Sequence, residues 1–123
     1  MIDASALLAL MLDERGAEVV RAAPRGSEIS IINVGEVLTR LVKLERDPTE
    51  ALNAILRMPL RIRKFREEHA LAVAQLLPLT AHLGLSFGDR ACLAQAQMSD
   101  MPALTADTKW AQLDIGIEIH LIR

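Results

Sequence analysis

Four acidic residues, each placed where an apolar run meets the start of a helix-like segment, constrain the fold of this 123-residue chain most strongly. Asp3 lies in MIDASALLAL, Glu36 in ISIINVGEVLTRL, Asp89 in LGLSFGDRACLA and Asp107 in PALTADTKW. An unpaired charge is costly in apolar surroundings, and two carboxylates about 4 Å apart repel by roughly 4 kcal/mol at an effective dielectric constant near 20. A fold that gathers the four therefore needs a cation, and oxygen ligands indicate a hard divalent metal.

Short apolar runs alternate with helix-like segments along the whole chain. A very short strand ends at Ile2 and Asp3, and further strands are predicted over 28–31, 60–65, 103–106 and 115–122. Helices are predicted over 5–12, 16–21, from Ser30 or Asn33 to about 45, from Asp47 to before Pro59, and over 67–77, 86–98 and 109–113. This alternation predicts a single α/β domain over 1–123, with a mostly parallel central sheet flanked by helices.

Several helix starts carry recognisable capping patterns, and two helix boundaries stay open. Asn33 as the cap would put Glu36 at the capping-box position, whereas Ser30 is the alternative cap. Ser86 and Asp89 form a second capping box, and Pro78 is expected to close or kink the helix before it. Since ligands of such sheets bind beyond the carboxyl ends of the strands, the four acids are expected to meet at that edge.

Composition excludes several classes of protein. A hydrophobic fraction of 51% argues against disorder, and a single Cys allows no disulfide within the chain. Asp3 and the lack of a basic leader argue against a signal peptide, and no apolar stretch is long enough to span a membrane, so the cytosol is expected. The net charge of −2 gives no global footprint for nucleic acid. The basic run over 57–66 is either a contact for RNA phosphates or a solvated face.

Taken together, the four acids and their contexts resemble the PIN-domain ribonucleases, and specifically the VapC-type toxins of bacterial and archaeal toxin–antitoxin pairs. DASALLAL carries the first acid with Ser5 beside it, INVGEVLTRL the second with Asn33, GLSFGDRACLA the third, and LTADTKWAQL the fourth with Thr105 before it. The resemblance covers essentially the whole chain. One departure is that only two residues precede the first acid, so the first strand is unusually short or the chain starts downstream of its natural start.

The resemblance implies a metal-dependent endoribonuclease that hydrolyses RNA phosphodiester bonds with metal-activated water, leaving a 5′-phosphate and a 3′-hydroxyl. Mg²⁺ or Mn²⁺ would be held by Asp3, Asp89 and Asp107, with Glu36 as a ligand or an outer residue. The residues implied to orient ligands or waters are Ser5, Asn33 and Thr105. The resemblance also implies a homodimer and a cognate VapB-like antitoxin that inserts into the active-site groove. The apolar faces of 7–12 and 37–44 are candidates for the dimer contact.

Other interpretations compete with this one. Each acid taken alone could be a helix-start residue that only stabilises the helix dipole or caps the helix. The chain could be a catalytically silent PIN-like α/β interaction module, or a phosphatase, although the Asp-x-Asp signature common in one phosphatase class is absent after Asp3. His69, His82 and His120 lack metal-ligand spacing. Arg90 could reach a phosphate or brace the site.

Overall fold

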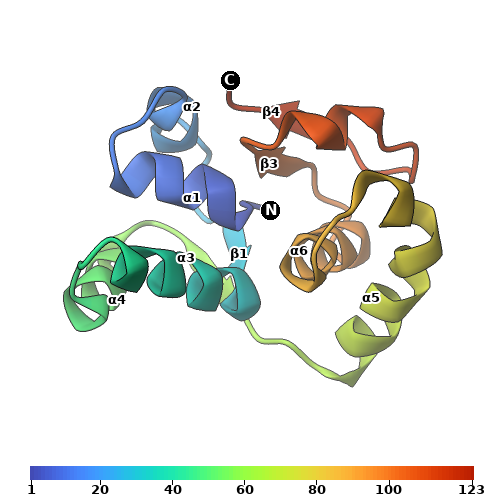
Figure 1. The fold of residues 1–123 in the computed structure, drawn as a ribbon, viewed down its shortest axis with the longest axis horizontal. Coiled ribbons are helices and arrows are strands. Elements are labelled where there is room, and N and C mark those ends of the chain that lie inside the picture. Colours follow the sequence, from blue (N-terminus) through green and yellow to red (C-terminus); the bar gives the residue numbers. More distant parts are fainter.

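Four short parallel strands and one bridging residue form the central sheet of the computed structural model, which describes residues 1–123 (Figure 1). The strands are β1 (Glu28–Ser30), β2 (Arg61–Arg63), β3 (Ala103–Thr105) and β4 (Ile119–Leu121). β1 pairs with β2 and β3 pairs with β4, while Ile2 bridges Ile29 of β1 and Leu104 of β3. The sheet order is therefore β2–β1–Ile2–β3–β4, and the predicted α/β fold with a parallel sheet is confirmed.

The first few residues are inserted into the middle of this sheet. The Ile2 N–H donates to the carbonyl of Glu28 at 2.7 Å, and the Asp3 N–H donates to the carbonyl of Leu104 at 2.9 Å. The Leu104 N–H in turn donates to the carbonyl of Met1 at 2.8 Å. The very short first strand expected from the sequence is thus a single residue with strand neighbours on both sides.

Helices cover both faces of the sheet. They are α1 (Ala4–Met11), α2 (Ala17–Arg21), α3 (Ile31–Lys43), α4 (Pro48–Arg57), α5 (Glu67–Thr80) and α6 (Phe87–Met98), with the 3-10 turns η1 (Ala81–Leu83) and η2 (Thr108–Gln112). In Figure 1, α1 to α4 gather on one side of the molecule and α5 and α6 on the other. None of these helices combines the length and apolar character that a membrane span requires.

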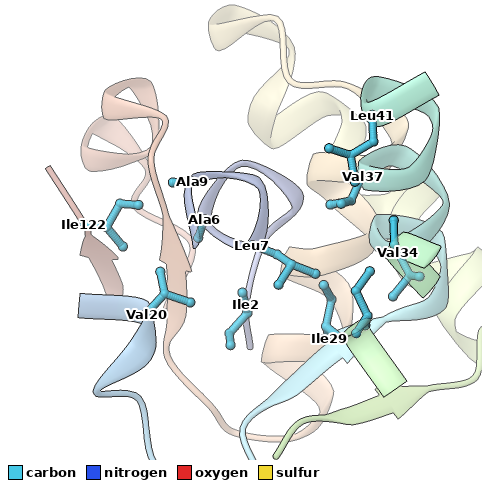
Figure 2. Packing of buried hydrophobic residues seen from close by; sticks show 12 residues of the cluster. Ile2, Ala6, Leu7, Ala9, Val20, Ile29, Val34, Val37, Leu41 and Ile122 are labelled. Atoms are coloured by element: carbon cyan, nitrogen blue, oxygen red, sulfur yellow. The ribbon is translucent and has the colours of Figure 1, made fainter. Parts of the chain in front are cut away.

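Two hydrophobic clusters fill the space between the sheet and the helices on its two sides. The first joins Ile2, Leu7 and Ile29 to residues of α2, α3 and α4, and Figure 2 shows these three side chains meeting at its centre. The second lies under α5 and α6 and contains Met1, Cys92 and the only tryptophan of the chain, Trp110. Met1 and Ile2 therefore point into different clusters, as consecutive residues of an extended segment must.

One open alternative is resolved, and the boundaries of two elements differ from the sequence-based prediction, each for a local reason. Ser30 caps α3, because the Ile32 N–H donates to its hydroxyl at 3.2 Å, and Asn33 lies inside the helix. α5 continues through Pro78 to Thr80, whose hydroxyl donates to the carbonyl of Leu76 at 2.9 Å. The alternation over 115–122 yields only the three residues of β4, since its earlier apolar side chains pack on the second cluster outside any strand.

Candidate active site

Asp3, Glu36, Asp89 and Asp107 line one pocket of about 460 Å³. Asp3 precedes α1, Glu36 lies in α3, Asp89 lies in the first turn of α6, and Asp107 follows β3 at the start of η2. Parallel strands end at one edge of a sheet, and the helices that follow them begin there. The chain therefore brings its four singled-out acids to one place from four separate segments.

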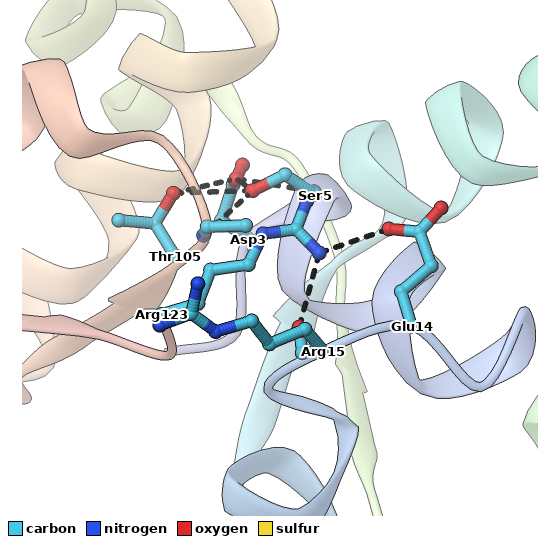
Figure 3. A network of polar contacts seen from close by, with 7 residues as sticks. Asp3, Ser5, Glu14, Arg15, Thr105 and Arg123 are labelled. Carbon is cyan, nitrogen blue, oxygen red and sulfur yellow. Dashed lines mark hydrogen bonds and ion pairs between the residues drawn. The ribbon is translucent and has the colours of Figure 1, made fainter.

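The carboxylate of Asp3 is held by three donors on one of its oxygens. Its Oδ2 accepts from the Ser5 N–H at 3.1 Å, the Ser5 hydroxyl at 2.5 Å and the Thr105 hydroxyl at 3.0 Å. Figure 3 shows Ser5 and Thr105 converging on this carboxylate. The Asp107 N–H donates to the Thr105 hydroxyl at 3.1 Å. The Thr105 hydroxyl therefore links Asp3, which follows Ile2, to Asp107, which follows β3.

The second group of polar contacts in Figure 3 lies outside the acidic pocket and joins Arg123 to the loop after α1. The Arg123 guanidinium donates from Nη1 to Glu14 Oε2 and to the carbonyl of Arg15, both at 3.0 Å. It ties the last residue to the loop between α1 and α2. None of these three residues lines the acidic pocket.

Glu36 is positioned by a contact between α3 and α6. The Asn33 amide donates from Nδ2 to Glu36 Oε2 at 2.8 Å and to the carbonyl of Gly88 at 3.1 Å. Asn33 is fully buried, and its Oδ1 has no hydrogen-bond partner in the chain. The Asn33 amide thus donates to both Glu36 and Gly88, and a side chain at Gly88 would fit only if the Glu36 carboxylate moved.

Asp89 and Asp107 also stabilise the starts of the helical segments to which they belong. Asp89 Oδ2 accepts from the Ser86 N–H at 2.7 Å in the predicted capping box, and Asp107 Oδ1 accepts from the Lys109 N–H at 3.0 Å. In each of the four acids these bonds engage one carboxylate oxygen, and the other accepts no hydrogen bond from the chain. Capping in three of the acids, and the Asn33 hydrogen bond in Glu36, therefore fix the carboxylates and leave four oxygens without a partner.

Burial and mutual repulsion raise the pKa values of two of these acids. Burial is the main cause for Asp3, which is only 2% exposed, and the charge of Asp89 raises its pKa further against the hydrogen bonds from Ser5 and Thr105. The pKa of Glu36 is also raised, first by burial and then by the charges of Asp3 and Asp89, while the Asn33 hydrogen bond opposes the shift. Asp3, Glu36 and Asp89 therefore share one electrostatic environment in which a positive charge is favourable.

The donor set fits a hard divalent cation, although it is not a finished coordination shell. Carboxylate oxygens are the ligands that Mg²⁺ and Mn²⁺ prefer, and each acid keeps one oxygen free of hydrogen bonds. No three His, Cys, Asp or Glu side chains, however, stand together in a metal-binding arrangement. Since like charges push unscreened carboxylates apart, a bound cation would have to draw these side chains inward.

Sequence reasoning missed two members of the site and left one residue open. Arg40 lines the pocket one turn after Glu36, and nothing in its sequence context distinguishes it from other basic residues of the chain. Gly88 was not singled out, because nothing in the sequence indicates a carboxylate from α3 against it. Arg90 donates to the carbonyl of Val73 at 2.9 Å and lies 5.9 Å from the Phe87 ring centre, so it braces α6 against α5 outside the pocket lining.

The comparison with protein families identifies the class to which this fold and pocket belong. The PIN domain family model matches residues 1–116, so the chain belongs to the PIN domain family. This agrees with the resemblance of the four acidic segments. No curated protein matches the chain by sequence.

Solved structures with the same fold include toxins of toxin–antitoxin pairs. A toxin–antitoxin complex from Klebsiella pneumoniae aligns with a TM-score of 0.78 and 21% identity over 99% of this chain and 96% of that chain. VapC20 of Mycobacterium tuberculosis, a toxin that cleaves the sarcin–ricin loop, aligns with a TM-score of 0.77 and 19% identity over 89% and 91%. VapBC-1 from nontypeable Haemophilus influenzae aligns with a TM-score of 0.72 and 17% identity over 99% and 96%.

The absence of a side chain at Gly88 gives a matched test of how Glu36 is positioned. In Gly88→Ala the added methyl group would displace the Glu36 carboxylate and break its hydrogen bond from Asn33, so we expect a loss of about 0.5–1.5 kcal/mol in the free energy of unfolding that offsets the gain in helix propensity. The control is Gly35→Ala, which meets no atom within 4 Å and should gain up to about 1 kcal/mol of helix propensity. Urea denaturation measures both, and equal stabilities would contradict the packing described here.

The raised pKa values of Asp3 and Glu36 predict how stability depends on pH without metal. A carboxyl group whose pKa is higher in the folded state contributes stability below its unfolded pKa, near 4, and that stability is lost as pH rises through the folded pKa. We expect this loss to be smaller in Asp3→Asn, which does not ionise. Urea denaturation in EDTA between pH 4 and 8 measures it, and identical pH profiles for the two proteins would refute the electrostatic account.

Proposed function

We propose that this PIN-domain protein is a metal-dependent endoribonuclease and the toxin of a toxin–antitoxin pair. The observation that carries the proposal is the gathering of Asp3, Glu36, Asp89 and Asp107 around one pocket at the carboxyl edge of the sheet. A protein that only scaffolds others gains nothing from four neighbouring carboxylates, two of which have pKa values raised by burial and by the charges of nearby acids. The toxins among the solved structures of the same fold support it, including one that cleaves the sarcin–ricin loop.

Asp3, Asp89 and Asp107 are the residues proposed to hold Mg²⁺ or Mn²⁺, with Glu36 as a further ligand or an outer residue. When bound, such an ion supplies a water molecule of lowered pKa and neutralises charge on the scissile phosphate. Ser5 and Thr105 hold one oxygen of Asp3 and leave the other free of hydrogen bonds.

Asn33, which is buried, holds one oxygen of Glu36 in the same way, by donating a 2.8 Å hydrogen bond to it. Hydrogen bonds of this kind fix the geometry of metal ligands and commonly change activity tenfold or more when removed.

Arg40 is the cation that the pocket offers to the substrate. It is exposed at the rim and forms no ion pair within the chain, although Glu36 lies one turn away. A guanidinium group binds phosphate oxygens through paired hydrogen bonds. We therefore propose that Arg40 binds the phosphate next to the bond that is cut. The proposed substrate is cytosolic RNA.

The chemistry predicts the products and the effects of substitution. Attack by water on phosphorus needs no ribose 2′-hydroxyl, so RNA fragments should carry a 5′-phosphate and a 3′-hydroxyl. Asp3→Asn, Glu36→Gln, Asp89→Asn and Asp107→Asn should each lower activity at least tenfold, the scale typical for groups in and around metal sites. EDTA should abolish cleavage and added Mn²⁺ restore it. End-labelling of the fragments and initial rates measure these outcomes.

Two controls separate this mechanism from its alternatives. His82→Ala should cleave like the wild type, since this exposed histidine lies outside the pocket. In the wild type, Mg²⁺ at ten times its dissociation constant should raise the free energy of unfolding by about 1.4 kcal/mol, and Asp89→Asn should lose most of that gain. A 2′,3′-cyclic phosphate, or cleavage that persists in EDTA, would overturn the mechanism. A silent interaction module would neither cleave RNA nor respond to metal.

The proposed partner is a cognate VapB-like antitoxin that blocks the acidic pocket. The most favourable plug is an Arg side chain, because a guanidinium pairs with two carboxylate oxygens at once. We expect one Arg→Ala or Lys→Ala substitution in the antitoxin to restore RNA cleavage in the presence of the complex. If every such variant still inhibits, the electrostatic plug is wrong.

A homodimer is also part of the proposal, and the segments that the sequence favoured for its contact, 7–12 and 37–44, are only partly buried. Leu7 and Leu41 are buried in the first cluster and unavailable, whereas Val42 and Leu44 are each 52% exposed and remain candidates. The available apolar side chains include Leu71, Leu77 and Leu79 on α5, which are 61%, 49% and 54% exposed. Light scattering that finds only a 13.5 kDa species at micromolar concentration would exclude the dimer.

A further inference from the structure

A second polar pocket, of about 350 Å³, lies between the end of β2, the start of α5 and the end of α6. Its polar lining comprises Arg63, Lys64, Arg66, Glu68, His69 and Ser99. We call it the basic pocket. It shares no residue with the acidic pocket, and nothing in the proposed chemistry uses it.

The basic pocket concentrates positive charge in a chain whose net charge is negative. Residues 57–66 hold five of the 14 basic residues and no acid, and three of these five line the pocket. Lys64 and Arg66 are exposed and form no ion pair, while Arg63 contacts Glu28 at 3.4 Å and keeps 45% of its side chain exposed. Only Glu68 opposes them, so the lining carries about two net positive charges.

His69 adds a buried donor whose direction the hydrogen bonding fixes. The residue is 6% exposed, and its Nδ1 accepts the N–H of Arg66 at 2.9 Å. The neutral ring must therefore carry its hydrogen on Nε2. That atom has no partner in the chain, yet it is not among the polar atoms sealed from solvent. Since His69 lines the basic pocket, this N–H is available to an acceptor there.

The ends of two helices modify this field in opposite directions. α5 begins at the pocket, and its 14 residues direct the positive end of their dipole toward it. α6 ends beside Ser99 and contributes a negative end of similar size, about half a charge. The two nearly cancel, so the side chains decide the sign. An anion with several acceptor oxygens satisfies both the charges and the free His69 N–H.

We propose that the basic pocket binds a backbone phosphate of the RNA that the acidic pocket cuts; this inference rests on the proposed function. The two pockets lie at opposite ends of α6, and the nine steps from Asp89 to Met98 span about 14 Å at 1.5 Å each. A stacked strand covers that length with about four nucleotides at roughly 3.4 Å each. The basic pocket would thus fix a distant part of the RNA and add affinity without touching the scissile bond.

Histidine NMR tests the pocket directly. Ring ¹H–¹⁵N spectra are recorded in EDTA while inorganic phosphate replaces chloride at constant ionic strength. We expect the His69 signals to move and those of His82 and His120 to stay. In Lys64→Ala/Arg66→Ala the phosphate needed for half the His69 shift should rise at least fivefold. A His69 signal that does not respond to phosphate would overturn the site.

RNA binding tests the assigned ligand independently of cleavage. The probe is a fluorescein-labelled single-stranded RNA of about 12 nucleotides, which is long enough to reach both pockets. Its fluorescence anisotropy is measured in EDTA at several salt concentrations. Lys64→Ala/Arg66→Ala should bind at least fivefold more weakly. Its salt dependence, log K against log salt, should be shallower by about 0.7 for each RNA phosphate that the variant no longer neutralises. The matched control is Lys43→Ala/Arg46→Ala, which removes the same charge from exposed positions elsewhere.

The outcomes separate this inference from the proposed function. If the pocket variant and the control lose equal affinity, or if phosphate moves His69 while RNA affinity is unchanged, the assignment to RNA is overturned, even where the wild type cleaves RNA. If the pocket variant alone loses affinity, the pocket stands, even where the wild type shows no cleavage and the nuclease proposal fails.

Discussion

The insertion of the first three residues between β1 and β3 is the constraint on which the rest of this molecule depends. Ile2 donates to the carbonyl of Glu28, while Met1 and Asp3 bond to Leu104, so the segment joins two halves of the sheet that do not otherwise pair. The same segment sends Met1 into one hydrophobic cluster and Ile2 into the other. Because the strand stops after one bridging residue, Asp3 emerges at once at the carboxyl edge, where it caps α1 and faces the pocket.

Capping and site formation are one process in this protein. A carboxylate that caps a helix has already lost its rotational freedom during folding, so holding it ready for a ligand costs little more. Asp3, Asp89 and Asp107 all use one oxygen in this way. The price of the arrangement is electrostatic: burial and repulsion raise the pKa values of Asp3 and Glu36, and the folded state is less favourable without a counter-charge.

The sequence predicted the order of the elements and the segments that meet at the pocket, because apolar periodicity and capping signals are local. It did not predict features that depend on what packs against an element. Pro78 remains inside α5, where neighbouring Leu76 and Thr80 are buried, although a proline usually ends a helix. Gly88 gained its importance only when α3 brought Glu36 against it. The ring nitrogen of His69 that stays free, Nε2, is set by the hydrogen bond from the Arg66 N–H to Nδ1, which the chain order alone does not reveal.

Trp110 gives this fold a built-in optical probe. It is the only tryptophan, there is no tyrosine, and its indole is fully buried in the second cluster. It also belongs to η2, the turn that Asp107 caps at the edge of the acidic pocket. Excitation of this one side chain therefore reports on a single environment, coupled by three residues of backbone to the pocket. A shift in its emission while the fold stays intact would signal movement of η2, and a full red shift would signal loss of the layer under α5 and α6.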